Sequence, residues 1–317
     1  MAAKAEVSGK PGENSLSAGG ANRPLREIRK SLPLRVLSEA DFRHWQTYGF
    51  VVIPQAVPAA NLERTVEFLG AFQEMDPADP ATWNAGQLRD HAMTELNYSG
   101  MVEAYNHQTL WDNRQCRRVY DAFVDIWDEE RLWVTIDRAN LNTPNRERRA
   151  FGGFIHTDVD TTLDPLPVNV QGVLSLMDAD EETGGFQCVP EMFRTFDEWR
   201  RRQPAGRDGF KPDIAGFEVY PVPMKAGDLL IFNSLLAHGI RPNRSKTRVR
   251  MAQYISMTPA DEGNEQLRRR RIESWSERRA PEGFAFPGDP REWERTRYST
   301  AKLTDLGRRL LGLDRWE

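Results

Sequence analysis

The stretch "GDLLIFNSLLAHG", residues 227–239, indicates the architecture of the chain. It starts with a Gly-Asp pair, continues as a short apolar run and ends in a histidine followed by glycine. An apolar run of this length between turn residues is typical of a buried strand. We therefore expect His238 at the rim of a sheet, where the strand ends.

Short runs of the same kind fill the chain from residue 131 onward, punctuated by Gly, Pro and Asp. They are "RLWVTIDRANLN" (131–142), "VNVQGVLSLMDAD" (168–180), "GGFQCVPEMF" (184–193), "FEVYPVPMKAGDLLIFN" (217–233) and "TRVRMAQYISMTP" (247–259). This density of strands is typical of a β-sandwich or barrel core. Because helix-like stretches come before them, we expect an α+β protein with helices flanking the strand core.

Helical spacing of apolar residues predicts helices near residues 38–48, 58–75 and 117–129, the first capped by Ser38. The Arg-rich stretch 268–279 predicts a solvated helix, and the Leu-rich stretch 303–316 predicts a further helix capped by Thr304. Residues 1–30, rich in Ala, Gly and Ser, are typical of a disordered tail. We expect one domain over residues 31–317, with a strand core at about 131–260 and a helical extension over 261–317.

Bulk composition excludes several classes of protein. The 317 residues carry a net charge of −4, which gives no electrostatic reason to bind nucleic acid. The two cysteines, Cys116 and Cys188, lie far apart and predict neither a disulfide framework nor a cysteine zinc site. No apolar run is long enough to span a bilayer. We expect a cytoplasmic protein with a small-molecule partner; the sequence does not specify an oligomeric state.

Two ligand-type residues stand close together in "FGGFIHTDVDTT", residues 151–162. Residues i and i+2 of a strand share one face, so His156 and Asp158 can point at the same ion. His238, at the end of an apolar strand, is the best candidate for a third ligand. Two histidines and one carboxylate form the facial triad of non-haem Fe(II) oxygenases, which leaves three coordination positions open for cosubstrate and dioxygen.

An oxygenase of this type needs two electrons besides those of its substrate, and 2-oxoglutarate can supply them. Its distal carboxylate needs a fixed cationic partner, for which the planar fork of arginine is well suited. Arg248 and Arg250 stand on the strand predicted after His238, two residues apart and therefore on one face. Spacing alone does not choose between them.

Several motifs in a consistent order resemble the phytanoyl-CoA dioxygenase family of Fe(II)/2-oxoglutarate enzymes. They are "YGFVVIP", "HTDVD", "ETGGFQCVPEMF", "KAGDLLIFNSLLAHG" and "PNRS" followed by arginine, spread over roughly residues 35–260. The resemblance implies a double-stranded β-helix (jelly-roll, cupin-like) core with flanking helices. It implies Fe(II), 2-oxoglutarate and O2 as cofactors, and the metal ligands His156, Asp158 and His238.

The resemblance also ranks the finer choices. The family's cosubstrate arginine precedes an x-Ala pair, which favours Arg250, with Arg248 as the alternative. Related halogenases lack the acidic ligand, so Asp158 favours hydroxylation or another oxidation that begins with hydrogen abstraction. The "EMF" that follows Val189-Pro190 departs from the family's usual Gly-Ser-His, so this turn need not bind a ligand.

The substrate is the open question of the sequence. On "VTIDRANLN", the side chains of Arg138, Asn140 and Asn142 share a strand face that resembles one lining the family's pocket, and an inward Arg138 would favour an anionic substrate. Two other functions stay open. One is a cupin-like metalloenzyme that does not use 2-oxoglutarate. The other is a non-catalytic jelly-roll protein that binds an anionic ligand.

Overall fold

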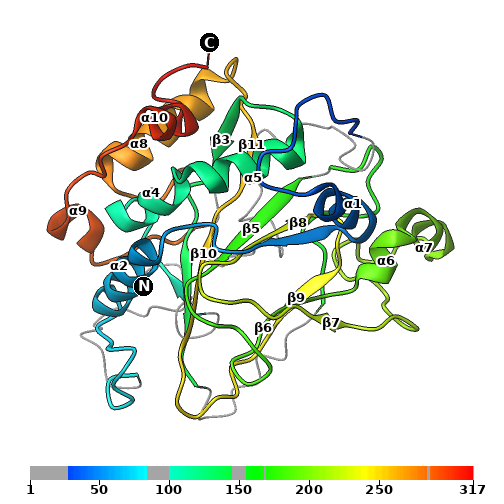
Figure 1. Ribbon diagram of the computed structural model, residues 1–317, viewed down its shortest axis with the longest axis horizontal. Coiled ribbons are helices and arrows are strands. Elements are labelled where there is room, and N and C mark those ends of the chain that lie inside the picture. Colours follow the sequence, from blue (N-terminus) through cyan, green and yellow to red (C-terminus); the bar gives the residue numbers. More distant parts are fainter. Residues whose placement is uncertain (1–27, 84–99, 145–154, 168, 284–285, 317) are drawn as a thin grey trace, which may run out of the picture.

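The computed structural model describes residues 28–83, 100–144, 155–167, 169–283 and 286–316 (Figure 1). The tail predicted over residues 1–30 therefore lies almost wholly outside the described residues. Its last part, residues 28–30, is described, and the Lys30 ammonium lies 2.8 Å from the carboxylate of Asp128. Among the described residues, no helix has the length and apolar character needed to cross a membrane.

The first elements agree with the sequence prediction. Helix α1 (Glu39–Tyr48) begins at a capping box, in which Ser38 and Asp41 satisfy each other's backbone N–H groups. It is followed by β1 (Phe50–Ile53) and α2 (Ala59–Phe72). The remaining elements, in chain order, are β2 (Met101–Val102), α4 (Gln108–Arg114), α5 (Arg117–Trp127), β3 (Leu132–Val134), β4 (Ala139–Asn142), β5 (Val170–Ser175), β6 (Gly185–Cys188), α6 (Pro190–Arg194), α7 (Phe196–Arg202), β7 (Tyr220–Pro221), β8 (Leu229–Asn233), β9 (His238–Arg241), β10 (Arg250–Tyr254), β11 (Met257–Pro259), α8 (Glu265–Glu277), α9 (Trp293–Arg297) and α10 (Asp305–Leu311).

The strands form a main sheet in the order β1-β8-β5-β10-β4-β2 and a smaller sheet in the order β7-β6-β9, with β11 and β3 as a separate pair. Every pairing between these strands is antiparallel. The inner faces of the two larger sheets pack together, with the rings of Phe186 and Phe232 4.8 Å apart. This arrangement confirms the predicted jelly-roll core with flanking helices (Figure 1).

Two predicted strands are each divided in the structure. Residues 131–142 form β3 and β4, which belong to different sheets, and residues 247–259 form β10 and β11. The chain therefore changes sheets between Val134 and Ala139, and again after Tyr254. Periodicity could not reveal this, because apolar alternation continues across the break while the hydrogen-bonding partners change.

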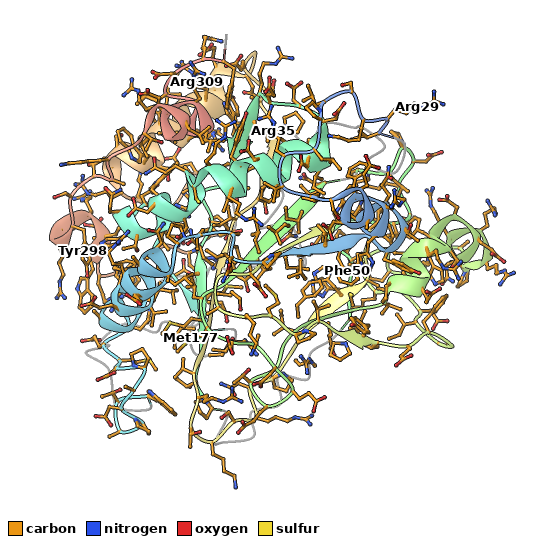
Figure 2. All side chains as sticks on the ribbon, viewed as in Figure 1. Arg29, Arg35, Phe50, Met177, Tyr298 and Arg309 are labelled. Atoms are coloured by element: carbon orange, nitrogen blue, oxygen red, sulfur yellow. The ribbon has the colours of Figure 1, made fainter. Side chains whose placement is uncertain are left out.

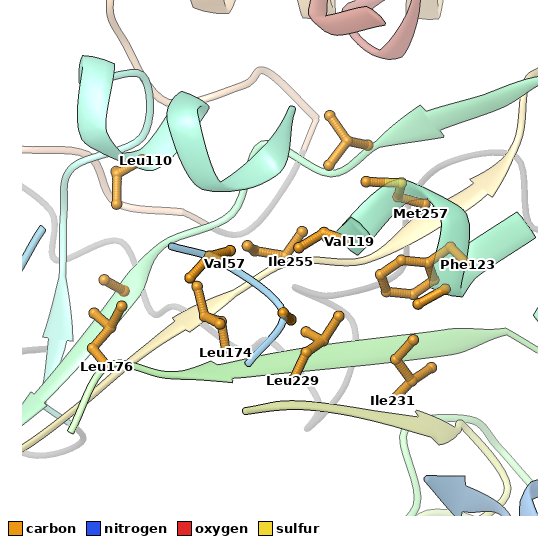
Figure 3. Close-up of a cluster of buried hydrophobic side chains, with 14 of the residues drawn as sticks. Val57, Leu110, Val119, Phe123, Leu174, Leu176, Leu229, Ile231, Ile255 and Met257 are labelled. Carbon is orange, nitrogen blue, oxygen red and sulfur yellow. The ribbon is translucent and has the colours of Figure 1, made fainter. Parts of the chain in front are cut away.

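The outer face of the main sheet holds the larger apolar core. Leu174, Leu229 and Ile231 of the sheet pack beneath Phe123 of α5, and all four are fully buried (Figure 3). The N-terminal segment is fastened to the same helix, because the buried carboxylate of Asp125 accepts the backbone N–H groups of residues 35–37. Arg35, labelled in Figure 2, adds an ion pair with Asp121 of α5. These contacts stabilise one side of the sheet and leave its other face to the interior of the jelly roll.

Helices α8 and α10 cover the end of the molecule that carries β3 (Figure 1). Helix α10 is capped by Thr304, as the sequence predicts. The Arg-rich helix α8 is not a wholly solvated helix, because Arg271 is buried and donates to the carbonyls of Val134, Leu310 and Leu311. One arginine of the run thus joins α8, α10 and β3.

Candidate metal centre

Three side chains predicted as ligands meet at the rim between the two sheets. His156 Nε2 lies 3.5 Å from Asp158 Oδ1, and His238 Nε2 lies 3.6 Å from Asp158 Oδ2. One ligand atom from each residue lies within 4.8 Å of the other two. With metal–ligand bonds of about 2.1 Å, adjacent corners of an octahedron are ~3 Å apart. Binding of one ion would therefore draw the three atoms closer together.

Backbone hydrogen bonds hold the two histidines together. The N–H of His156 donates to the carbonyl of His238 over 2.8 Å, and the N–H of His238 donates to the carbonyl of His156 over 2.9 Å. On its other side, His238 pairs with Cys188 of β6. The two ligand positions, 82 residues apart in sequence, are therefore fixed by one reciprocal bridge.

The imidazole of His238 is prepared for a metal ion. Its Nδ1 lies 2.9 Å from the carbonyl oxygen of Leu236, and only an N–H can bond to that acceptor. Nε2 then carries the lone pair and faces Asp158, which is the arrangement typical of a metal-bound histidine. Burial lowers the pKa of His238 to about 4, so the ring is neutral near pH 7. Neutral imidazole is the form that binds metals.

The loop that carries Asp158 is braced from the segment after α7. The N–H of Thr157 donates to the carbonyl of Phe210 over 3.0 Å, and the N–H of Thr161 donates to the carbonyl of Gly209 over 3.1 Å. A Cβ at Gly209 would lie 1.7 Å from Asp160 Oδ1, so the close approach requires glycine. Asp160 itself is engaged within its own turn, where it accepts the N–H and hydroxyl of Thr162.

A further side chain contacts the acidic ligand. Gln171 of β5 donates its amide Nε2 to Asp158 Oδ2. Sequence reasoning did not identify Gln171, although one signal was available, since it is a lone amide within the mostly apolar run 170–176. A polar residue in such a run needs a partner, but which partner it meets depends on the tertiary structure.

Arg250 lies in the interior with its guanidinium surrounded by neutral acceptors. It is 6% exposed. Its Nη1 donates to the carbonyls of Thr183 (2.6 Å) and Arg241 (3.0 Å), and its Nη2 donates to Asn142 Oδ1 (2.6 Å). Within the described ranges, no carboxylate forms an ion pair with it. Burial lowers the pKa of Arg250 to about 10, so the group remains a cation near pH 7 and lacks a counter-charge.

A pair of glycines allows this placement. A Cβ built on Gly184, whose φ is +76°, would lie 2.4 Å from the carbonyl oxygens of Arg241 and Pro242 and 2.8 Å from Nη1 of Arg250. Gly185 also has a positive φ, of +116°, and begins β6. Gly184 is thus explained by the close approach of the Arg241 and Pro242 carbonyls and of the arginine, and Gly185 by its positive φ.

Arg248 has entirely different surroundings, although both arginines were expected on one strand face. It precedes β10, its side chain is 41% exposed, and it pairs with Asp180 (2.8 Å) and Glu182 (2.6 Å). These two carboxylates raise its pKa above the ordinary arginine value. The strand begins only at Arg250, so the two-residue periodicity does not extend to Arg248.

The three residues considered for substrate contact belong to β4 or its approach. Arg138 is buried and pairs with Glu103 over 2.7 Å, and its guanidinium lies 4.5 Å from the ring centroid of Phe286. Asn142 accepts the hydrogen bond from Arg250. Asn140 lies opposite Met101 in the sheet register. Because Glu103 already neutralises Arg138, the inward position of this arginine is no argument for an anionic substrate.

Tyr254 lies at the far end of β10, on the same face as Arg250. Burial raises its pKa to about 12, so the phenol is protonated. No residue in the described part of the chain forms a hydrogen bond with its hydroxyl, and the apolar cluster between the two sheets packs against its ring. The hydroxyl of Tyr254 is therefore a hydrogen-bond donor that faces the interior between the sheets.

The remaining histidines take no part in this cluster. His44 packs against the rings of Tyr48 and Phe50. His107 caps α4 and stacks on Phe68 at 3.6 Å between ring centroids. His91 lies outside the described residues. In the ranges that the structure describes, His156, Asp158 and His238 are the single group suited to a metal ion.

Comparison with known proteins adds three findings. The sequence pattern of the family described as phytanoyl-CoA dioxygenase (PhyH) matches residues 45–252. Ava biosynthesis cluster protein O of Aspergillus versicolor is 23% identical, over 67% of this chain and 74% of that protein. Two crystal structures share the fold. GlcNAc Inducible Gene 2 (GIG2, DUF1479) of Candida albicans has a TM-score of 0.64 and 13% identity, over 89% of this chain and 77% of that chain. The hypothetical protein JW0805 of Escherichia coli has a TM-score of 0.60 and 15% identity, over 87% of this chain and 82% of that chain.

Proposed function

Because the chain belongs to the phytanoyl-CoA dioxygenase family, whose cofactors are Fe(II), 2-oxoglutarate and O2, we propose that it hydroxylates, or otherwise oxidises, a C–H bond of a small-molecule substrate. The coproducts would be succinate and carbon dioxide. The observation that carries the proposal is the combination, inside one jelly roll, of the His-Asp-His cluster and a buried arginine without a counter-charge.

The residues of the cluster fit the metal by the chemistry of their donors. His156, Asp158 and His238 would hold Fe(II) through two neutral imidazole nitrogens and one carboxylate oxygen, leaving three positions for 2-oxoglutarate and O2. Bound Fe(II) supplies the oxygen chemistry; the protein supplies position and exclusion of water. Asp158 occupies the position of the acidic ligand, which favours hydroxylation over halogen transfer.

Arg250 is the proposed partner of the distal carboxylate of 2-oxoglutarate. Its Nη1 bonds to the carbonyl of Arg241, three residues along β9 from His238. Three residues of a strand span about 10 Å, a distance that an iron-bound five-carbon dicarboxylate can bridge. The dicarboxylate would supply the missing negative charge, since burial of a cation without a counter-charge is costly. Arg248 is already paired at the surface and serves as a natural control.

The competing functions make different predictions. A cupin-like metalloenzyme without 2-oxoglutarate would bind the metal ion but not the keto acid. A non-catalytic binding protein would bind an anion with no need for the metal cluster. Neither explains why one fold holds both the cluster and an arginine without a counter-charge at its inner face.

A matched pair of variants tests the proposal. Calorimetric titration of 2-oxoglutarate into the anaerobic Fe(II) protein should show that Arg250→Gln weakens binding by roughly 30- to 1000-fold. Loss of a buried charge-assisted contact costs about 2–4 kcal/mol, and about 1.4 kcal/mol corresponds to a factor of ten. Arg248→Gln should change the affinity less than threefold, because its partners are exposed. Equal effects of the two variants, or none, would contradict the assignment.

A further inference from the structure

We propose that Gln171 is a positioning residue for the acidic metal ligand, and that it keeps Asp158 coordinated through one oxygen. The inference rests on the proposed function, because it assumes that Asp158 holds Fe(II). It concerns a side chain of the main sheet that lies outside the ligand triad.

The direction of the hydrogen bond follows from the chemistry of the two groups. An ionised carboxylate has no proton to give, so the amide must present its N–H to Asp158 Oδ2. Gln171 stands opposite Phe232 of β8 in the sheet register. Phe232 in turn packs against the ring of His238, with 4.5 Å between ring centroids. The amide therefore reaches the carboxylate from the sheet that also supports a ligand histidine.

The contact acts on the side chain alone, because the backbone of Asp158 is fixed separately. Its N–H donates to the carbonyl of Ser234 over 3.2 Å. The Asp158 carboxylate can still rotate about its side-chain bonds, and the amide of Gln171 restricts that rotation. Oδ2, which also lies 3.6 Å from His238 Nε2, accepts the amide, so the proposal assigns Oδ1, 3.5 Å from His156 Nε2, to the ion.

Single-oxygen coordination has a consequence for the cosubstrate. Two histidines and a carboxylate bound through one oxygen leave three positions, of which a chelating keto acid needs two and O2 needs one. A carboxylate that turned to bind through both oxygens would take one of them. We therefore expect Gln171 to affect both metal affinity and the entry of 2-oxoglutarate.

The decisive variant is Gln171→Met, which keeps an unbranched side chain of similar size but lacks the donor. Loss of an outer hydrogen-bonding partner of a metal ligand typically weakens metal binding ~10- to 100-fold. We expect a loss in that range for Fe(II), measured anaerobically by competition with a chelator and without substrate. The visible charge-transfer band of the Fe(II)–2-oxoglutarate complex should then require roughly tenfold more keto acid.

Two further variants separate positioning from folding. Gln171→Asn retains an amide that is one methylene too short, so it should weaken Fe(II) binding as Met does. Val173→Ala removes a buried neighbour on the same strand, and should lower thermal stability while leaving the Fe(II) affinity within threefold of wild type. If Val173→Ala weakened metal binding as much as the two Gln171 variants, the effect would be general loosening, and the proposal would be overturned.

The same titrations distinguish the two levels of inference. A wild-type protein that binds no Fe(II) would refute the proposed function itself. A wild-type protein that binds Fe(II) and 2-oxoglutarate, together with a Gln171→Met variant of equal affinity and equal band formation, would refute only the role of Gln171.

Discussion

The two faces of the main sheet, built by alternate residues of the same strands, differ sharply in chemistry. On β10, Arg250, Ala252 and Tyr254 face the interior between the sheets. Their neighbours Met251 and Ile255 are fully buried in the apolar core beneath the helices, where Figure 3 shows Ile255.

The polar side chains of β10 differ between the two faces in the partners that the protein supplies. On the helix side, the buried amide of Gln253 bonds to Asn113 and to the carbonyl of Leu110. On the interior side, Arg250 lacks a counter-charge and the hydroxyl of Tyr254 lacks a described partner. A polar side chain whose partners the protein supplies contributes stability, whereas a buried cation without a counter-charge beside an unpaired donor is suited to receive a ligand.

The largest effect should come from removing a ligand on the interior side. His156→Ala would leave two protein ligands, so Fe(II) affinity should fall by more than the ~100-fold that loss of an outer partner costs. Turnover should be abolished. Fe(II) titration measures metal affinity at the interior face, and a thermal melt of the metal-free protein measures the stability that the apolar core provides. His44→Ala is the control, and wild-type affinity in His156→Ala would remove that residue from the triad.

At Met251, next to Arg250 but on the helix side of the sheet, we expect a loss of stability without a loss of ligand affinity. Met251→Ala removes a fully buried side chain, and such a change typically costs 2–5 kcal/mol because it leaves a cavity. Urea denaturation should show this loss, while 2-oxoglutarate affinity of the folded protein stays within threefold of wild type. A variant that lost cosubstrate affinity instead of stability would show that the two faces are not independent.

A smaller effect should follow from filling the space beside Arg250. Gly184→Ala adds a Cβ in a left-handed conformation and against Nη1 of Arg250. Displacement of the guanidinium should weaken 2-oxoglutarate binding by roughly tenfold, or about 1.4 kcal/mol. Gly216→Ala has a similar φ, of +83°, with nothing within 4 Å, and should leave cosubstrate binding unchanged. Equal titration curves for Gly184→Ala and wild type would argue against Arg250 as the anchor.

The smallest expected effect is a pH dependence of the free energy of unfolding, which arises in the outer helical layer. Glu294 of α9 is buried and accepts the backbone N–H groups of Tyr105 and Asn106. Burial raises its pKa to about 7, from 4.5. The folded state then binds the proton more tightly than the unfolded state, so this stabilisation is complete below pH 4.5 and is lost as the pH rises through 7.

Between pH 6 and 8, the free energy of unfolding of the metal-free protein should therefore fall by on the order of 1 kcal/mol. Glu294→Gln should flatten this dependence. Urea denaturation at a series of pH values tests both statements, and a rise in stability over the same interval would mean that the two N–H donors outweigh burial. Fe(II) affinity, which depends on the other face, should show no difference between Glu294→Gln and wild type.

The sequence was sufficient for the general fold because its signals are local. Strand density after residue 131, the caps at Ser38 and Thr304, and the order of the motifs depend on residues close together in the chain. The structure also brings together the three residues expected at the metal cluster, which were recognisable from ligand type and position at strand ends. Their role as ligands remains a prediction.

The surroundings of the two arginines could not be obtained in this way. Both stand in "TRVRMAQ", and apart from the x-Ala pair to which the family resemblance gives weight, nothing local separates them. Only the folded chain places Asp180 and Glu182 beside Arg248, and only the sheet register places Asn142 beside Arg250. A charge is neutralised by whatever lies near it in space, and the sequence does not list those neighbours.

The amino-acid sequence by itself thus determined a strand core with flanking helices and the residue types available for chemistry, because periodicity and turn residues act over a few positions. The jelly-roll class followed from the resemblance to a known family. The tertiary structure decided which face each polar side chain occupies and what it meets there. Gln171 reaches Asp158, Arg138 is neutralised by Glu103, and Arg250 is buried without a counter-charge. Pairing between distant strands sets those encounters, and burial then fixes their energetic weight.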